Sequence, residues 1–296
     1  KKYFNPNALY PMITIITGRG CPYGCIFCVY PQTLQGRGYR QRSVANVVQE
    51  FEYIVREFPG VKAVFIEDDT FTANKKRCAE FSEEIIRKGI RISWTANARA
   101  DADYETLRLM KKAGCRCLCV GFESGDQGVL NQMHKGIRLP DAGRFVEDAK
   151  KAGILVHGCF MVGNPGDTRE TLKRTLELAK SLNPDTAQFY PIMPYPGTEG
   201  YQWAKESGFL RTTDYSKWLT EEGLHNCVIS TSELSSEDLV RFCDYARRAF
   251  YLRPGYVASK CWQMLSHPKE IRRLVKAART AVKYLMRGSF PQRKSI

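Results

Sequence analysis

The segment Met12-Ile-Thr-Ile-Ile-Thr17-Gly-Arg-Gly20-Cys21-Pro-Tyr-Gly-Cys25-Ile-Phe-Cys28 joins a short apolar, β-branched run directly to three cysteines. The run predicts a buried strand that ends at a glycine-bounded turn. Three thiolates with x3 and x2 spacing on one tight loop can bind three irons of a cubane cluster and leave the fourth iron open. A zinc site is the alternative, but it needs a fourth ligand, and no Cys or His follows Cys28 before Cys78. The segment therefore predicts an iron–sulfur centre at the end of a strand.

Further apolar runs follow at intervals along the chain, at Ala63–Glu67, Ile92–Ala96, Cys117–Phe122, Leu155–Val162 and Ala187–Met193. Helical periodicity occupies the intervals, from an N-cap at Ser43 to about Glu57, and over Lys75–Lys88, Tyr104–Lys112, Asp141–Lys151 and Arg169–Leu182. Strands that alternate with helices predict an α/β fold with a parallel sheet, either doubly wound or bent into a partial barrel. The longer connections follow the strands, so we expect the site at the carboxyl ends of the strands.

Length and composition define the class of protein. With 296 residues, the chain has the length of one large α/β domain with a small appendage. No apolar run approaches the roughly 20 residues that a membrane span needs. The 11 cysteines are too sparse for a disulfide scaffold, and no basic-then-apolar signal segment opens the chain. We therefore expect a reducing, cytoplasmic compartment in which the thiols are free or bound to metal.

The net charge of +14 is concentrated near the end of the chain. From Arg241 to Ile296 there are 14 basic residues and two acidic ones, which gives +12 and leaves +2 for the first 240 residues. A nearly neutral main body argues against a nucleic-acid partner. The basic tail needs a separate explanation.

The tail predicts two helices, Ser232–Tyr251 and His267–Arg287, with Leu252–Ser266 as a connector that contains an Arg-Pro-Gly turn. Within Ile271–Arg287, apolar residues fall on one helical face and basic residues line its flank. Such a helix can lie on an anionic bilayer. A helix that caps the domain with a solvated basic face is the main alternative, and a tRNA or another polyanion is a third.

The cysteine loop, with Phe27 just before its last cysteine, resembles the radical S-adenosylmethionine (radical SAM) superfamily, and the resemblance extends from about Thr14 to Gly200. It implies a six-stranded partial (β/α)6 barrel of the TIM type. It also implies that Cys21, Cys25 and Cys28 hold a [4Fe-4S] cluster that cleaves SAM reductively to a 5′-deoxyadenosyl radical, which abstracts hydrogen from an organic substrate.

The resemblance further implies SAM contacts after the second predicted strand, where Glu67, Asp68 and Asp69 follow one another. A carboxylate at this place would accept a hydrogen bond from the SAM ammonium. The family commonly has Gly-Gly-Glu here, so the departure leaves open which of the three carboxylates makes the contact. A solvated acidic loop is the structural alternative.

Three later strand ends resemble other SAM-binding positions of the family. Arg99, after the third strand, would reach the SAM ribose or carboxylate, with a surface ion pair as its alternative. Glu123, in a Gly-Phe-Glu-Ser-Gly stretch typical of the cobalamin-associated branch, would bind near the ribose or amine. Met161 and Gly163, at the end of the fifth strand, would let the backbone approach the adenine.

Cys115, Cys117 and Cys119 alternate along the fourth predicted strand, so we expect all three side chains on one face. On a rigid strand they span roughly 13 Å and cannot all close on one small cluster. Small apolar packing is therefore the expected role, with a radical-handling thiol as the alternative.

Together these features predict a radical SAM enzyme of the cobalamin-associated class, similar to enzymes of hopanoid lipid biosynthesis. We expect 1–11 to be a linker from an upstream cobalamin-binding domain, 12–200 the partial barrel, and 201–296 a basic helical extension. The substrate would be an organic small molecule, with a lipid or isoprenoid as one candidate for modification or C-methylation. The class also implies a reductase such as flavodoxin or ferredoxin, and the basic tail implies peripheral contact with the inner face of an anionic membrane. The alternatives are a tRNA-modifying radical SAM enzyme and a non-enzymatic iron–sulfur protein.

Overall fold

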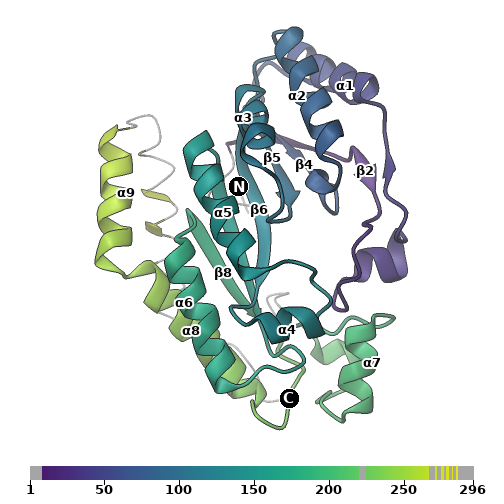
Figure 1. Ribbon diagram of the computed structural model, residues 1–296, viewed down its shortest axis with the longest axis vertical. Helices are drawn as coiled ribbons and strands as arrows, with labels where there is room; N and C mark the ends of the chain where they lie inside the picture. The colour runs from purple at the N-terminus through teal and green to yellow at the C-terminus, as the bar shows by residue number, and fades with distance from the viewer. Residues whose placement is uncertain are drawn as a thin grey trace. The chain divides into compact units, whose positions relative to one another are not determined.

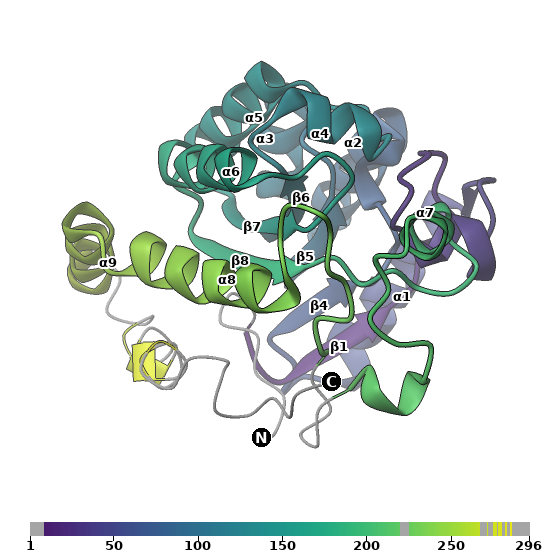
Figure 2. The same cartoon turned by 90° about the horizontal axis from the view of Figure 1, so that it is seen from below.

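The computed structural model describes residues 9–219 and 225–266, and beyond them the single positions Ile271, Val275, Lys276, Ala278, Arg279, Val282 and Leu285. Six strands form one sheet in the order β1-β4-β5-β6-β7-β8 (Figures 1 and 2). Their bounds are β1 Met12–Ile15, β4 Ala63–Ile66, β5 Ser93–Ala98, β6 Cys115–Glu123, β7 Leu155–Val162 and β8 Thr186–Pro191. The pairs β1–β4, β4–β5 and β5–β6 run parallel. The predicted alternation of six strands with helices is confirmed.

Five helices connect these strands close to where the periodicity predicts them: α1 Val44–Glu57, α2 Lys75–Arg87, α3 Tyr104–Lys112, α5 Leu139–Ala152 and α6 Arg169–Leu182. Polar N-caps begin four of the five. The side chains of Ser43, Asn74, Asp103 and Thr168 each accept a hydrogen bond from the backbone N–H three residues later. Each cap accepts a hydrogen bond from a backbone N–H that has no partner within the helix. The residue type at the cap therefore determines where each of these helices begins.

Several short elements were not predicted: the hairpin strands β2 Gly18–Arg19 and β3 Arg40–Gln41, the helical turns η1 Tyr30–Leu34, η2 Phe71–Ala73 and η3 Tyr215–Lys217, and the helices α4 Gln127–Gln132 and α7 Glu199–Glu206. The hairpin and η1 both lie in the long connection 18–42 that carries the cysteines. That connection is therefore structured by elements of its own.

The contacts divide the chain into two compact units. The first holds the chain through Phe122, together with His134–Cys159 and Pro184–Thr186. The second holds Glu123–Met133, Phe160–Asn183 and the chain from Ala187 onward. The predicted boundaries at 11 and 200 stay a prediction.

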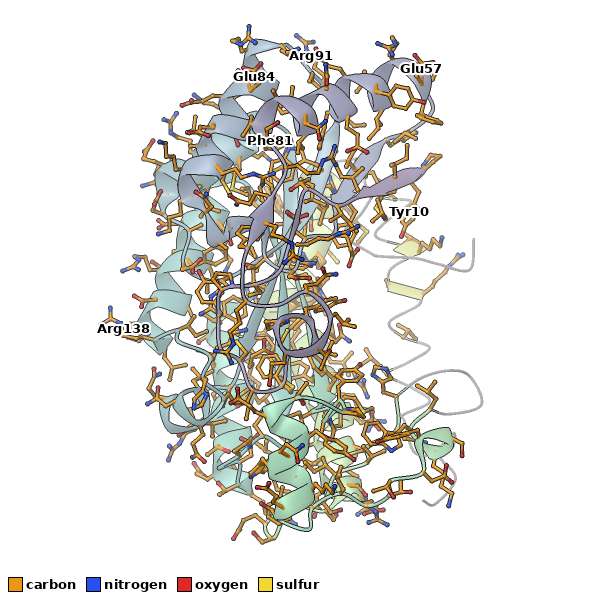
Figure 3. All side chains as sticks on the ribbon, turned by 90° about the vertical axis from the view of Figure 1, so that its right-hand side faces the viewer. Tyr10, Glu57, Phe81, Glu84, Arg91 and Arg138 are labelled. Atoms are coloured by element: carbon orange, nitrogen blue, oxygen red, sulfur yellow. The ribbon has the colours of Figure 1, made fainter. Side chains whose placement is uncertain are left out.

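The core of the first unit is aromatic. Helices α1, α2 and α3 pack side by side in chain order, beside β4 and β5 (Figures 1 and 2). Beneath them, the rings of Phe81 and Phe71 each lie 5.6 Å from that of Trp94 on β5, edge to face, and Phe51 of α1 joins at 5.3 Å from Phe81. All four side chains are buried. Phe81 is buried and Arg91 is exposed, and both are labelled in Figure 3.

Strand β6 contains a β-bulge near its start. Trp94 pairs with Cys115, whereas the next residue of β5, Thr95, pairs with Cys117. Arg116 is therefore an extra residue on β6. Odd-numbered residues before and after Arg116 consequently point to opposite faces of the sheet.

The bulge separates the three cysteines of β6. Cys115 shares the face of Trp94, and the thiol of Cys115 has Lys111 of α3 and Cys78 of α2 among its electrostatic neighbours. Cys117 and Cys119 lie on the opposite face, and the interaction of the Cys119 thiol with the Cys117 thiol lowers the pKa of Cys119. The prediction that all three share one face is wrong, because it assumed strict alternation along the strand.

The end of the chain differs from the sequence prediction in one element. Helix α8, Ser236–Tyr251, confirms the first predicted helix, but α9, Pro254–Ser266, occupies the predicted connector. Proline stabilises the first turn of a helix, where its missing N–H is not needed, so Pro254 begins α9 rather than breaking the chain. Of the predicted helix His267–Arg287, seven positions are described and helical, and the rest lies outside the described residues. No helix in the described parts has the length and apolar character to cross a membrane.

The aromatic core gives a stability prediction. Replacing Phe81 with alanine should lower the free energy of unfolding by about 3–5 kcal/mol, because the substitution removes a buried ring and leaves a cavity. Phe58→Ala is the matched control, since Phe58 is exposed and its loss should change stability by about 1 kcal/mol or less. Urea denaturation followed by circular dichroism measures both, and equal losses for the two variants would contradict this account of the core.

Candidate metal centre

The three cysteines of the predicted cluster lie on one loop directly after β2. Cys25 is buried, Cys21 and Cys28 are half-buried, and all three carry free thiols. The backbone N–H of Cys28 donates to the carbonyl of Cys25 at 3.2 Å, which closes the turn between them. Burial raises the pKa of Cys21, and it raises the pKa of Cys28 to about 12. In the metal-free loop these thiols therefore hold their protons, which a metal would displace on binding.

The side-chain amide of Gln32 fixes the backbone of this loop. Its Nε2 atom lies 3.0 Å from the carbonyl oxygen of Cys25, 3.0 Å from that of Ile26 and 3.1 Å from that of Cys28. One amide group therefore holds three carbonyls of the turn that joins two of the predicted ligands. Sequence reasoning missed Gln32, because its only signal is its place four residues beyond the last cysteine.

The first cysteine is positioned by close packing of two backbone segments. Gly20 has a φ of +89°, and a Cβ atom at this position would lie 2.3 Å from the carbonyl oxygen of Gly38. Cys21 donates its N–H to the carbonyl of Gly36 at 3.4 Å. Only glycine allows both this φ and this approach at position 20, so the loop starts at a fixed point.

Asp68, one of the three predicted SAM carboxylates, is turned toward the end of β1. It is fully buried, and its two oxygens accept hydrogen bonds from the backbone N–H and the hydroxyl of Thr17, both at 2.6 Å. The hydroxyl of Tyr39 lies 3.4 Å from the same carboxylate. These contacts give Asp68 a structural role in the support of the loop, and which of the three carboxylates contacts SAM stays a prediction.

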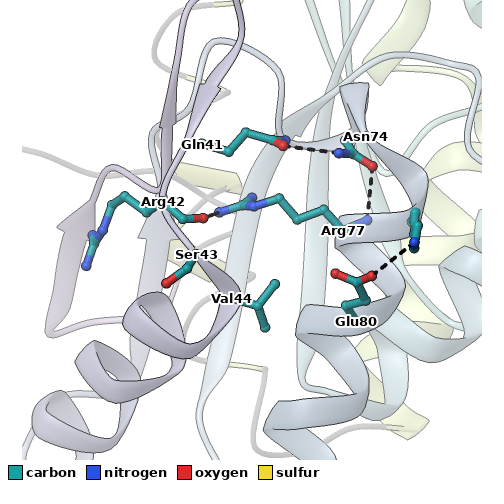
Figure 4. A pocket seen from close by; sticks show the side chains of 8 residues that line it. Gln41, Arg42, Ser43, Val44, Asn74, Arg77 and Glu80 are labelled. Atoms are coloured by element: carbon teal, nitrogen blue, oxygen red, sulfur yellow. Dashed lines mark hydrogen bonds and ion pairs between the residues drawn. The ribbon is translucent and has the colours of Figure 1, made fainter.

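Arg77 of α2 completes this support from the other side. Its buried guanidinium donates to the carbonyls of Thr17 at 3.1 Å and Arg42 at 3.2 Å, and so ties β1 to the end of the hairpin. Figure 4 shows the side chain of Arg77 crossing from α2 to the backbone of Arg42, along a polar pocket of about 320 Å³. The residues of this pocket were not predicted as functional.

The other two carboxylates differ from Asp68 in their surroundings. Asp69 is half-buried and accepts the N–H of Gly20 at 2.9 Å, so it touches the cysteine loop. Glu67 is exposed. Partial desolvation raises the pKa of both carboxyl groups. Asp69 thus lies beside the first ligand, and Glu67 presents a carboxylate to solvent.

Arg99 is packed against the cysteine loop. Its guanidinium lies 3.6 Å from the centroid of the Tyr23 ring and 3.9 Å from the Sγ atom of Cys25, and it donates to the carbonyl of Lys135. Asp101 lies 3.5 Å from its Nε atom and accepts the hydroxyl of Tyr23 at 3.1 Å. The buried Arg99 therefore places a positive charge beside a predicted ligand. A direct contact between Arg99 and SAM stays a prediction.

Glu123 lies at the carboxyl end of β6, in the second unit. It is buried, and its φ of +64° is unusual for a residue with a Cβ atom. The hydroxyl of Tyr190 on β8 donates to its Oε2 atom at 3.3 Å. Backbone strain of this kind is retained most often at functional sites, which supports the choice of Glu123 from the sequence.

The predicted adenine-binding turn follows β7 in the same unit. Asn164 donates from its side chain to the carbonyl of Met161 at 2.9 Å and from its backbone to Asp167 at 2.9 Å. The Oδ1 atom of Asn164 is buried without a hydrogen-bond partner, so the turn keeps one unsatisfied acceptor that sequence reasoning missed. Gly163 has a φ of +83°, and a Cβ atom there would lie 2.8 Å from a methyl carbon of Leu239. Packing against α8 is thus one reason for this glycine.

The donor set of the cysteine loop is chemically suited to an iron–sulfur cluster. Thiolates are the usual protein ligands of such clusters, and each binds a different iron. Cys21, Cys25 and Cys28 supply three thiols on one loop, and the guanidinium of Arg99 lies beside the Sγ atom of Cys25. Among the residues that the structure describes, no group of three or more His, Cys, Asp or Glu side chains is arranged to hold a single metal ion.

The chain is similar to known proteins over much of its length. Residues 15–179 match the model of the radical SAM superfamily. The chain is 36% identical to an uncharacterized methyltransferase of Pyrococcus horikoshii over 82% of this chain and 52% of the relative. It is 31% identical to the hopanoid C-3 methylase of Methylococcus capsulatus over 73% of this chain and 40% of that enzyme.

A solved structure supports the fold. The radical S-adenosylmethionine methyltransferase TsrM of Kitasatospora setae, with its tryptophan substrate and a SAM analog bound, superposes with a TM-score of 0.62 at 26% identity, over 68% of this chain and 40% of TsrM. The chain thus spans about half the length of the first relative and two fifths of the other two proteins. The expected partial barrel is confirmed. The match over more than half of its residues shows that the chain belongs to the radical SAM superfamily, whose enzymes use a [4Fe-4S] cluster and S-adenosylmethionine.

Proposed function

We propose that the chain is the catalytic part of an enzyme that cleaves SAM reductively, with Cys21, Cys25 and Cys28 as the cluster ligands. The resulting 5′-deoxyadenosyl radical abstracts hydrogen from an organic substrate. The cysteine loop carries the proposal, because its three free thiols lie within the family match and Gln32 holds the turn between the last two of them.

When bound, a [4Fe-4S] cluster supplies the electron that breaks a carbon–sulfur bond of SAM. The chain's own residues hold the ligands in place and balance charge. Asp68 anchors the strand end before the loop through Thr17. The guanidinium of Arg99 is buried beside the sulfur of Cys25. Its positive charge would therefore offset the negative charge of Cys25 when Cys25 binds the cluster as a thiolate.

The SAM contacts are part of the same proposal. In the first unit we assign the amine contact to Glu67 or Asp69. In the second unit we assign ribose or amine recognition to Glu123, and adenine recognition to the turn that contains Met161 and Gly163. The strained backbone of Glu123 and the unsatisfied acceptor in the turn after Gly163 support these roles.

The reaction that we propose is C-methylation, or a related modification, of a biosynthetic substrate, with cobalamin supplied by a domain outside this chain. Methyltransferases recur among the relatives, and one of them is named for a hopanoid. A lipid or isoprenoid is therefore the proposed substrate class. The reaction needs an electron donor, for which a flavodoxin or ferredoxin is the proposed type.

Removal of a single ligand tests the proposal. After anaerobic reconstitution, Cys25→Ala should contain less iron than the parent and form no 5′-deoxyadenosine from SAM and dithionite, because the cluster loses one of its three anchors. The exposed Cys261 offers a matched control, and Cys261→Ala should retain both properties. Iron analysis and chromatography of SAM products measure the outcome. Unchanged iron content and SAM cleavage in Cys25→Ala would refute the ligand assignment.

The hydrogen bonds of the Gln32 side chain to the cysteine loop give an independent prediction. Gln32→Glu keeps the size of the side chain, but it removes the N–H donors and places a carboxylate next to three carbonyl oxygens. Gln32 is half-buried, and each lost hydrogen bond costs on the order of 1 kcal/mol, so reconstituted protein should hold less cluster and lose it faster in air. The absorbance of the cluster around 400 nm follows this loss. Gln202→Glu, at an exposed position on α7, should behave like the parent. Equal cluster content and lifetime in both variants would show that Gln32 is dispensable.

We further propose that the basic end of the chain docks on an anionic membrane. Helix α9 exposes large apolar side chains, with Trp262 71% and Leu265 74% exposed. Further along, the described apolar positions Ile271, Val275 and Val282 are also exposed, as are Lys276 and Arg279. Apolar side chains that enter the headgroup region beside basic ones are typical of peripheral membrane helices. The sequence suggested membrane contact for Ile271–Arg287 alone. The exposed side chains of Trp262 and Leu265 support including α9 in the proposed membrane-binding surface.

Vesicle co-sedimentation tests the membrane proposal. The parent protein should pellet with phosphatidylserine-containing vesicles at low ionic strength and stay in solution at high ionic strength. The double variant Trp262→Glu, Leu265→Glu should bind at least about tenfold more weakly, because it removes the two largest apolar contacts of α9. Val55→Glu, at an exposed apolar position of α1, is the matched control and should bind like the parent. A parent protein that does not pellet with anionic vesicles at low salt would rule the proposal out.

A further inference from the structure

Arg99 is a buried cation in contact with the middle cysteine of the loop. Its side chain is 7% exposed, and its Nη1 atom donates to the Sγ atom of Cys25 at 3.9 Å. Burying a guanidinium is costly unless hydrogen bonds or negative charge replace its water. The groups around Arg99 therefore determine how much of its positive charge is already compensated by the protein.

Three contacts hold Arg99 in place. Its Nη2 atom donates to the backbone carbonyl of Lys135, and its Cζ atom lies 3.6 Å from the centroid of the ring of Tyr23, within the cysteine loop. Its backbone N–H donates to the hydroxyl of Thr72 at 3.1 Å. Because these contacts come from three separate segments of the chain, the guanidinium has little freedom to move away from Cys25.

Asp101 is the carboxylate that faces this guanidinium, and it compensates the positive charge only in part. Its Oδ2 atom lies 3.5 Å from Nε of Arg99, and the same oxygen accepts the hydroxyl of Tyr23 at 3.1 Å. Both Nε of Arg99 and Oδ1 of Asp101 are buried without a hydrogen-bond partner. A strong arginine–carboxylate pair would instead use two parallel hydrogen bonds. Arg99 therefore keeps positive charge beside the sulfur of Cys25.

Other charged groups lie near the two ends of the loop. Asp69 accepts the N–H of Gly20, the residue before Cys21, at 2.9 Å. The Nζ atom of Lys135 lies 5.6 Å from the centroid of the ring of Phe27, the residue before Cys28. These two charges have opposite signs. Arg99 instead donates directly to a cysteine sulfur, so its effect on a cluster bound there should be the larger one.

We propose that Arg99 raises the reduction potential of the cluster and that Asp101 limits this rise. Charge and hydrogen bonds to the sulfurs are among the factors that set the potential of an iron–sulfur cluster. One-electron reduction adds a negative charge to the cluster, and a fixed positive charge at Cys25 stabilises the reduced state more than the oxidised one. Since Arg99 is buried, salt and water screen this interaction little.

Asp101 has the opposite charge, so it shifts the potential in the opposite direction. The inference rests on the proposed function, because it needs a cluster on the three cysteines. In the proposed reduction the cluster takes up one electron from the donor, and Arg99 neither gains nor loses an electron or a proton. Arg99 is thus a residue that tunes the cluster through its charge.

A redox titration of the reconstituted full chain without SAM tests the proposal. In Arg99→Gln the equilibrium constant for cluster reduction should fall at least about tenfold, which is a shift of about 59 mV to more negative potential for a one-electron couple. Asp101→Asn keeps the shape of the side chain and removes its charge, so the midpoint potential should become less negative than that of the parent. Electron paramagnetic resonance of the reduced cluster at each applied potential gives the midpoints, and iron analysis gives the cluster content.

Two further variants are the controls. Arg99→Lys retains the positive charge, so its midpoint should lie closer to that of the parent than to that of Arg99→Gln. Arg91→Gln removes an exposed charge that precedes β5, whereas Arg99 follows the carboxyl end of that strand, and it should keep the midpoint of the parent. If Arg99→Gln retains no cluster, Asp101→Asn decides, and a midpoint equal to or more negative than that of the parent would overturn the proposal.

The directions of the shifts separate charge from structure. A merely loosened loop would move the midpoints of Arg99→Gln and Asp101→Asn in the same direction, or leave both unchanged, and either result would overturn the proposal. A shift in Arg91→Gln as large as that in Arg99→Gln would do the same. If the parent forms no 5′-deoxyadenosine from SAM and dithionite, the proposed function itself fails. If the parent is active but shares its midpoint with Arg99→Gln, only the present inference fails.

Discussion

The buried carboxylate of Asp68 fixes the strand end from which the cysteine loop starts, and the candidate site depends on that loop. Burying an ionised carboxylate is costly unless hydrogen bonds replace the lost water. Here the backbone and hydroxyl of Thr17 provide them, and Arg77 binds the other side of the same residue. The end of β1 is therefore tied to the end of β4 and to α2 at once. Cys21 follows Thr17 by four residues, so the contacts that hold Thr17 also fix the start of the cysteine loop.

Much of the fold could be predicted from the sequence, because the signals that define its elements are local. Each apolar run that alternates with a helical pattern became a strand, and N-caps such as Ser43 and Asp103 fixed helix starts to the residue. The errors arose where two local signals compete. The Arg-Pro-Gly stretch reads as a turn, yet Pro254 suits the first turn of a helix equally well, and α9 begins there.

The candidate site was predictable to a smaller extent. The ligand spacing of Cys21, Cys25 and Cys28 is contiguous, so the sequence displays it directly. The groups that support the loop are not contiguous with it. Arg99 lies 74 residues from Cys25 along the chain and Asp68 lies 51 residues from Thr17, so only the folded sheet brings these pairs together. For the same reason the sequence offered three carboxylates as SAM contacts, whereas the fold turns the middle one toward the protein interior.

The extra residue in β6 reverses which positions of the strand point to each face of the sheet. Before Arg116 the strand presents its odd-numbered positions to the helices, and after it the odd-numbered positions face the other way. One continuous strand can therefore serve two layers with different chemical demands. After the bulge, the even-numbered residues Leu118, Val120 and Phe122 are fully buried and continue the packing that Cys115 begins beside Trp94. The odd-numbered residues up to Glu123 lie on the other face, so different positions of one strand serve the core and the candidate site.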